Sequence, residues 1–294
     1  MNRLEVIMTL LLLSLVGLVA IPAQICFASI GEMDTEDITD HITLMIKGDM
    51  CRDGIGVKQD YQMAFYWYSK AAIQGNLLAQ YYVAISYAHG IGVDKNFAKA
   101  FKLYHELADG GFVLAQYNLA HIYQNGKEVK RDIVEALKYY RMAADKGLKE
   151  AQFNLGNLYR RGEGVEQDDK EALKLYTLAA EQGDSDALFN IGELYALGEG
   201  VRQDFGTAAK YWLQAAENGN ANAQLNIGIC YINGDGVCQD NVEACFWLFV
   251  AKLSGCELAT QHLIRILQYL TNSEIDSVAY RAEQWHRNGM KQKR

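Results

Sequence analysis

Apolar residues along most of the chain recur with the spacing of one face of an α-helix. The stretch that begins at residue 151 shows the pattern at i, i+4, i+7 and i+8, with Ala151, Leu155, Leu158 and Tyr159. A second stripe follows after a short segment rich in glycine and charge, with Ala172, Tyr176, Ala179 and Ala180. Stripes of this kind are typical of amphipathic helices that bury one side. The pattern therefore predicts two helices joined by a turn.

These two helices are one unit of a repeat with a period of 36 residues. Three sets of small residues keep this period without any insertion. They are the alanines Ala79, Ala115, Ala151, Ala187, Ala223 and Ala259, the turn glycines Gly54, Gly90, Gly126, Gly162, Gly198 and Gly234, and the glycines Gly75, Gly111, Gly147, Gly183, Gly219 and Gly255. A fixed period of this length indicates an array of stacked helical hairpins, since one hairpin cannot bury its apolar face alone.

The residues between the stripes have the chemistry of helix ends. Gly162 and Gly164 favour the positive φ of a tight turn. Asp168 is predicted to cap the second helix, with Glu171 completing a capping box. Gly156 lies inside the first helix, and we expect another helix to cross there too closely for a side chain. Tyr140 and Tyr176 occupy matching positions in the second helices, and we expect them to pack in the core.

The unit from Ala151 to Gly183 resembles the Sel1-like repeat. The resemblance rests on the runs AQFNLGNLY, GEGV and EAL and on the final AAEQG. It implies an all-α fold, a right-handed α/α superhelical solenoid of helix-turn-helix repeats similar to tetratricopeptide repeats. It also implies a scaffold for protein–protein interaction that binds a protein or peptide on its concave face. Among exported bacterial members of the family, the partner can be a host protein.

The array is predicted to span residues 43–256 as six repeats, followed by C-terminal capping helices at 257–294. The last of these is expected to begin with a Ser273–Asp276 capping box and to stop at Gly289. Residues 1–28 have the features of a signal peptide, and residues 29–42 form an acidic lead-in. Export by the Sec pathway to the periplasm or the medium is therefore expected. The alternative is an uncleaved membrane anchor, which would make the protein a periplasmic adaptor.

The concave face supplies the candidate binding residues by analogy with tetratricopeptide arrays, whose first helices line that face. The candidates are Tyr81, Tyr117, His121, Phe153, Asn157, Arg160, Arg161, Phe189 and Glu193. Aromatic and arginine side chains often dominate binding energy. The competing interpretation is that the aromatic residues are half-buried packing groups and the arginines are solvated. An asparagine ladder, Asn118, Asn154, Asn190 and Asn226, could bind a peptide backbone or tie one hairpin to the next.

Composition narrows the possible functions. The net charge of −8 argues against a nucleic-acid partner, which requires clustered basic residues. We expect neither a metal nor a cofactor, and no enzyme activity, because no motif pairs a nucleophile with a base. The alternative is β-lactam binding or hydrolysis, which is linked to a cysteine-rich branch of the family, but the paired cysteines of that branch are missing here. Cys230 and Cys245 could form a disulfide or remain buried thiols.

Overall fold

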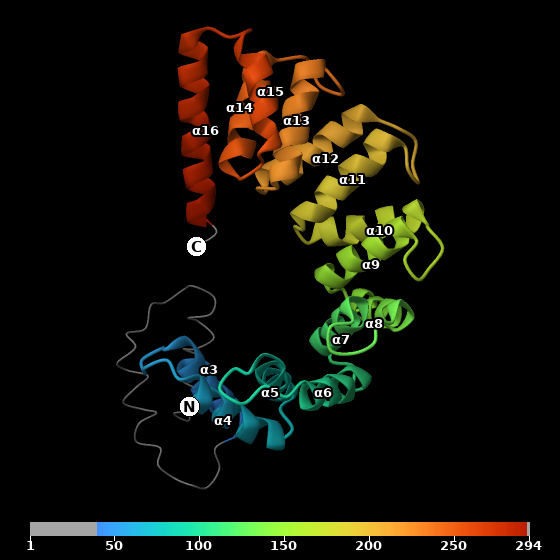
Figure 1. Ribbon diagram of the computed structural model, residues 1–294, viewed down its shortest axis with the longest axis vertical. Helices are drawn as coiled ribbons and strands as arrows, with labels where there is room; N and C mark the ends of the chain where they lie inside the picture. Colours follow the sequence, from blue (N-terminus) through green and yellow to red (C-terminus); the bar gives the residue numbers. More distant parts are fainter. Residues whose placement is uncertain (1–39, 293–294) are drawn as a thin grey trace, which may run out of the picture. The chain divides into compact units, whose positions relative to one another are not determined.

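The computed structural model describes residues 40–292, and all of the regular secondary structure in that part of the chain is helical (Figure 1). The helices are α3 His41–Asp53, α4 Tyr61–Ile73, α5 Leu77–His89, α6 Phe97–Asp109, α7 Val113–Asn125, α8 Ile133–Asp145, α9 Lys149–Arg161, α10 Asp169–Glu181, α11 Ser185–Leu197, α12 Phe205–Glu217, α13 Ala221–Asn233, α14 Asn241–Leu253, α15 Leu258–Leu267 and α16 Asn272–Gln292. This is the all-α repeat solenoid that the sequence predicts.

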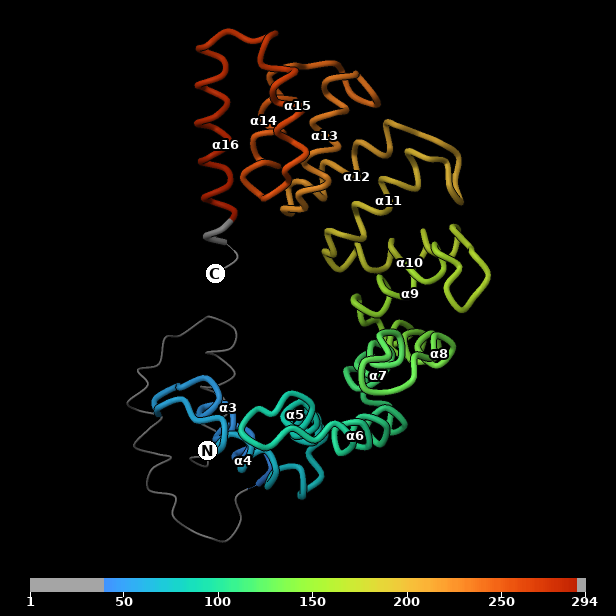
Figure 2. The backbone as a smooth tube through the Cα atoms, in the orientation of Figure 1, coloured from blue at the N-terminus to red at the C-terminus, as the bar shows by residue number. Residues whose placement is uncertain are grey.

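Within each of two units the helices pair as hairpins, and each hairpin packs on the next one along the chain. The described residues divide into two compact units between Ala115 and Gln116, a point that lies within α7. In the first unit α3 packs on α4, α4 on α5 and α5 on α6. In the second unit the same succession runs from α8 to α14, and α15 and α16 pack on α14 (Figure 2). Neighbouring hairpins therefore supply the apolar surface that one hairpin lacks.

The predicted helix caps at Asp168 and Gly162 are confirmed. The Asp168 carboxylate accepts hydrogen bonds from the backbone N–H groups of Lys170 and Glu171, both at 3.0 Å. The Glu171 side chain contacts Lys174 instead of completing the expected capping box. Gly162 ends α9 with a φ of 64°, a conformation that glycine adopts without steric cost. A Cβ on Gly164 would overlap Ile133 of the preceding hairpin, so this turn glycine also permits close stacking.

The expected close crossing inside each hairpin is also confirmed. A Cβ on Gly156 would lie 2.8 Å from the ring of Tyr176, which is fully buried. Gly192 makes the matching approach to Trp212, and Gly228 to Leu248. The glycine therefore leaves space for the large side chain of the crossing helix. Tyr140 is fully buried as well, which confirms its predicted place in the core.

A ladder of glutamines joins consecutive hairpins, and the sequence interpretation did not foresee it. Gln152, near the start of α9, donates through Nε2 to the carbonyl oxygen of Ala144 at the end of α8, at 3.3 Å. Gln224 makes the same bond to Ala216 at 3.1 Å. Buried side-chain amides of this kind satisfy helix-terminal carbonyl groups that have no partner within their own helix.

The C-terminal helix departs from the prediction at both ends. α16 begins at Asn272, and its capping box is formed by Thr271 and Glu274, whose carboxylate accepts from the Thr271 N–H at 2.8 Å. The predicted Ser273–Asp276 box is wrong; the glutamate side chain is one methylene longer and can reach back to the cap. Gly289 lies within the helix instead of ending it, because an internal glycine costs a helix only about 1 kcal/mol.

The predicted signal peptide and most of the lead-in lie outside the described residues. Across residues 40–292, no helix has both the length and the apolar character needed to cross a bilayer.

Candidate binding groove

A groove of about 680 Å³ lies on the second unit, where the first helices of three successive hairpins meet. Its lining comes from α9, α11, the start of α13 and the turns that follow α9 and α11. The lining residues are Phe153, Asn157, Arg160, Arg161, Gln167, Asp186, Phe189, Asn190, Glu193, Glu199, Asn220 and Asn222. Six of the nine residues predicted from the sequence are among them: Phe153, Asn157, Arg160, Arg161, Phe189 and Glu193.

Helical periodicity explains why these residues share one surface. Phe153, Asn157 and Arg160 stand at i, i+4 and i+7 on α9, which places them on one side of that helix. Phe189 and Glu193 occupy the same positions one repeat later, on α11. Because successive hairpins stack in the same orientation, these two stripes lie next to each other and line the groove.

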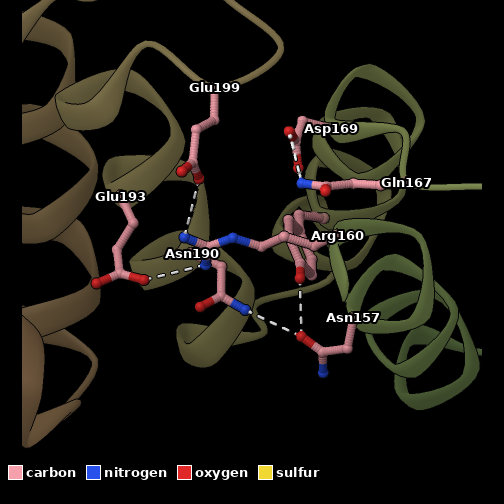
Figure 3. A network of polar contacts seen from close by, with 8 residues as sticks. Asn157, Arg160, Gln167, Asp169, Asn190, Glu193 and Glu199 are labelled. Atoms are coloured by element: carbon pink, nitrogen blue, oxygen red, sulfur yellow. Dashed lines mark hydrogen bonds and ion pairs between the residues drawn. The ribbon is translucent and has the colours of Figure 1, made fainter. Parts of the chain in front are cut away.

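Arg160 is the centre of the polar network in the groove (Figure 3). One of its terminal nitrogens lies 3.0 Å from Glu193 on α11, and the other lies 3.4 Å from Glu199 in the following turn. The Arg160 side chain is 21% exposed, whereas that of Arg161 is 67% exposed and lies 3.7 Å from Glu163. The interpretation of both arginines as solvated charges therefore does not hold for Arg160.

The electrostatic environment keeps Arg160 charged. Burial by itself would lower the pKa of its guanidinium group. The hydrogen bond to Glu193 and the charge interactions with Glu193, Tyr176 and Glu199 together outweigh burial, so the pKa is raised above its ordinary value. Opposite charges at this distance favour the ionised form. Arg160 is thus a permanent link between two consecutive hairpins.

A second set of contacts connects the floor of the groove with the core. The Tyr176 hydroxyl donates to Oδ1 of Asn157 at 2.7 Å, and Asn190 donates to the same oxygen at 3.4 Å. Burial raises the pKa of Tyr176 to about 12, which keeps the hydroxyl a donor. Asn154 donates to the Tyr117 hydroxyl at 3.3 Å. At Asn154 and Asn190 the asparagine ladder therefore ties hairpins together, as one of the two sequence interpretations proposed.

The remaining predicted residues lie elsewhere. Tyr117 and His121 are on α7, with their ring centroids 6.5 Å apart, and neither lines the groove. Tyr81 belongs to the first unit, where its ring packs 5.4 Å from that of Phe112. Phe153, which does line the groove, is half-buried, and its ring lies 5.9 Å from that of Tyr176. A role of these residues in partner binding stays a prediction.

Six residues of the groove were not among the predicted site residues. They are Gln167, Asp186, Asn190, Glu199, Asn220 and Asn222. The repeat period could have indicated two of these residues, because Asp186 and Asn222 are 36 residues apart at the start of successive first helices. A hydrophilic position that recurs from one repeat to the next can also face a shared groove.

The cysteines in the described part of the chain are free thiols. Cys230 and Cys245 are buried on α13 and α14, and burial raises the pKa of each to about 11. This agrees with the interpretation of two buried thiols. Among residues 40–292, no group of three or more His, Cys, Asp and Glu side chains is arranged to hold a metal ion.

Comparison with known proteins identifies the family. The model of the Sel1 repeat matches residues 48–76, 77–112, 113–148, 149–184, 185–220 and 221–255. A Sel1 repeat protein from Oxalobacter formigenes is similar in structure, with a TM-score of 0.69 and 33% identity over 76% of this chain and 91% of that one. A protective antigen present in uropathogenic Escherichia coli strains, which displays an SLR fold, has a TM-score of 0.54 and 28% identity.

The alignment with that antigen covers 86% of this chain and 61% of the antigen. No curated protein matches the sequence. Sel1 repeat proteins are generally protein-interaction scaffolds, and the fold is typically non-enzymatic. The six matched repeats and the structural similarity together show that this chain belongs to the Sel1 repeat family.

Proposed function

We propose that this protein is a scaffold that holds a segment of a partner protein in the groove lined by α9, α11 and α13. The observation that carries the proposal is the groove itself, which is built from first helices of consecutive repeats. A surface shared by several hairpins can follow an extended ligand along the array, and extended concave surfaces are what repeat proteins use for binding.

The chemistry of the lining favours a polypeptide. Amide side chains, among them Asn157, Gln167 and Asn222, can donate to and accept from a peptide backbone. Phe153 and Phe189 provide apolar contact beside these polar groups. Groups that combine apolar contact with a few placed hydrogen-bonding partners are typical of binding pockets. A partner segment with an extended backbone and at least one apolar side chain fits this lining.

Arg160 and Arg161 have different roles in this proposal. Arg160 is held by Glu193 and Glu199 and therefore positions α11 and its turn against α9. Arg161 is largely exposed at the groove and is free to contact a partner after only a weak interaction with Glu163 is lost. Arg161 and the exposed Asn222 are thus the better targets for mutations that affect binding without affecting folding.

The experiment is affinity capture with purified protein, followed by mass spectrometry of the bound proteins. We expect a partner that the wild-type chain retains and that an Arg161→Glu/Asn222→Arg variant loses. Arg265→Glu, an exposed charge reversal on α15 outside the groove, is the matched control and should retain the partner. Capture of the same proteins by the groove variant and the wild type would refute the assignment of the groove.

We also propose that the chain is exported and that its partner is a host protein. The signal-like segment at residues 1–28 supports export, and the similarity to a protective antigen of uropathogenic strains supports a location outside the cytoplasm. Sequencing the N-terminus of protein recovered from the periplasm and the medium tests export directly. A start at Ser29 is expected, and an N-terminus that still contains residues 1–28 would instead indicate an anchored protein.

A further inference from the structure

The outer face of α4, in the first repeat, has a composition that the inner repeats do not share. The positions that match Tyr66 in the next four repeats are all lysine: Lys102, Lys138, Lys174 and Lys210. The positions that match Ile73 are all acidic: Asp109, Asp145, Glu181 and Glu217. Only in the last repeat do both become apolar again, as Phe246 and Leu253. The first and the last repeats therefore differ from the others in the same way.

In the last repeat the structure shows the reason for this change. Helix α16 packs along α14 (Figure 1) and buries Phe246 to 6% exposure. The ring of Trp285 on α16 lies 5.7 Å from that of Trp247, edge to face. Arg281 stacks on the Phe246 ring at 4.1 Å and forms an ion pair with Glu243 at 2.6 Å. An apolar outer face thus serves here to dock an amphipathic helix.

Helix α4 carries the same aromatic pair at the same register. Tyr66 and Trp67 meet edge to face with ring centroids 4.9 Å apart, and Phe246 and Trp247 meet at 5.1 Å in the same manner. Among the described residues of the first unit, where α4 packs on α3 and α5, no helix covers this face. Met63 is 41% exposed, Tyr66 44% and Ile73 87%, so apolar side chains along the length of this helix are open to solvent, with Lys70 between Tyr66 and Ile73.

The charged side chains on the outer face of α4 differ from those on α14. The position of Glu243 on α14, the ion-pair partner of Arg281, is occupied by Met63 on α4. The position of Val250 is occupied by Lys70. The ammonium group of Lys70 lies 4.7 Å from the centroid of Tyr66, and that of Lys47 lies 4.8 Å from the centroid of Trp67. Where α14 offers the carboxylate of Glu243 to Arg281 of α16, α4 offers two ammonium groups. Charge complementarity to these two lysines therefore favours a docking helix that carries carboxylates.

We propose that the outer face of α4 is a second interaction surface, which binds an amphipathic α-helix of a partner protein with acidic residues beside its apolar stripe. The docking geometry is that of α16 on α14, with the sign of the central ion pair reversed. Charge disfavours a symmetric contact between two copies of this face, because each copy would bring its lysines to the same stripe. This surface does not depend on the groove of the second unit.

The test uses a labelled synthetic peptide with the sequence of residues 272–289 in which Arg281 is replaced by Glu, and the unmodified peptide as its control. Binding to the full chain is measured by fluorescence anisotropy at low salt. We expect the Arg281→Glu peptide to bind about 10-fold more tightly than the unmodified one, because repulsion from two lysines becomes attraction. Lys70→Glu in the protein should abolish this preference, because one positive and one negative charge then remain at the face.

A Tyr66→Lys/Ile73→Asp variant restores the residue types of the inner repeats and should weaken binding of the Arg281→Glu peptide about 10-fold or more. Val134→Lys, at a position that is 67% exposed on α8, is the matched control and should bind as the wild type does. Both variants should melt at the wild-type temperature. Equal affinity of the Tyr66→Lys/Ile73→Asp variant and the wild type would overturn the proposal.

Two further results would also overturn it by assigning the face to another occupant. One is peptide binding that occurs only after residues 29–39 are deleted, which would make the chain's own acidic lead-in the occupant. The other is a dimer, detected by analytical ultracentrifugation, that the Tyr66→Lys/Ile73→Asp variant loses, which would make a second copy of the chain the occupant. The proposal requires the intact chain to bind the peptide as a monomer.

Discussion

The hydroxyl of Tyr176 donates a hydrogen bond to Oδ1 of Asn157 across 2.7 Å, and this bond joins the buried core of a hairpin to the floor of the groove. Tyr176 is fully buried beneath α9, whereas Asn157 is half-buried and lines the groove. The same residue pair therefore links the stability of the repeat to the shape of its binding surface. This relationship allows packing and hydrogen bonding to be tested separately.

Tyr176→Ala should lower the free energy of unfolding by about 3–5 kcal/mol, because it leaves a large cavity beside Gly156. Tyr176→Phe keeps the ring and removes only the hydrogen bond, so its cost should be about 1 kcal/mol. Urea denaturation followed by circular dichroism measures both values. A loss below about 1 kcal/mol for the alanine variant would contradict the packing observed around Tyr176.

Two glycine-to-alanine substitutions inside helices should have opposite effects. Gly156→Ala places a Cβ 2.8 Å from the Tyr176 ring and should destabilise the protein by about 1–3 kcal/mol through overpacking. Gly289→Ala meets no atom within 4 Å and should stabilise α16 by about 0.5–1 kcal/mol through higher helix propensity. Differential scanning calorimetry of both variants provides the comparison. Stabilisation by Gly156→Ala would show that the crossing helix moves aside.

Replacement of Arg160 by Met should cost about 1–2 kcal/mol, since it leaves Glu193 and Glu199 without their shared cation. The matched variant Arg161→Met removes a more exposed charge and should cost less than about 0.5 kcal/mol. Chemical denaturation at low and high salt separates the effects. The difference between the variants should shrink at high salt because ions screen partly exposed pairs. Equal costs would contradict the central role of Arg160.

The buried thiols should react slowly and make stability sensitive to alkaline pH. Burial raises the pKa of Cys230 and of Cys245 to about 11, whereas in the unfolded chain both titrate near an ordinary value of about 8.5. Between these values only the unfolded state loses the protons, so stability falls as pH rises through this window. Mass spectrometry after iodoacetamide treatment at neutral pH should find the exposed Cys238 modified first.

The Cys230→Ala/Cys245→Ala variant is the control for the pH dependence, because it lacks both thiols and should show a smaller loss of stability above pH 9 than the wild type. Rapid alkylation of Cys230 or Cys245 in the native protein would show that the α13–α14 hairpin opens more readily than its burial implies. Tyrosine ionisation contributes to both proteins alike and cancels in the difference.

The sequence by itself determined the repeat, its period, the helix caps at Asp168 and Gly162 and the buried positions of the core. Gly54, Asp168 and Tyr176 act through interactions within one hairpin, and the chemistry of a cap, a turn or a close crossing is set by residue types at fixed spacings. The same information predicted six of the groove residues, because a helical stripe places Phe153, Asn157 and Arg160 on one face.

Only the tertiary structure determined which polar side chains of consecutive hairpins contact each other. It placed Glu199 against Arg160, 39 residues away in the sequence, and brought Asp186 and Asn222 to the same groove. Local spacing cannot settle these points, because the partners of a partly exposed polar side chain depend on the distance and orientation at which two hairpins stack.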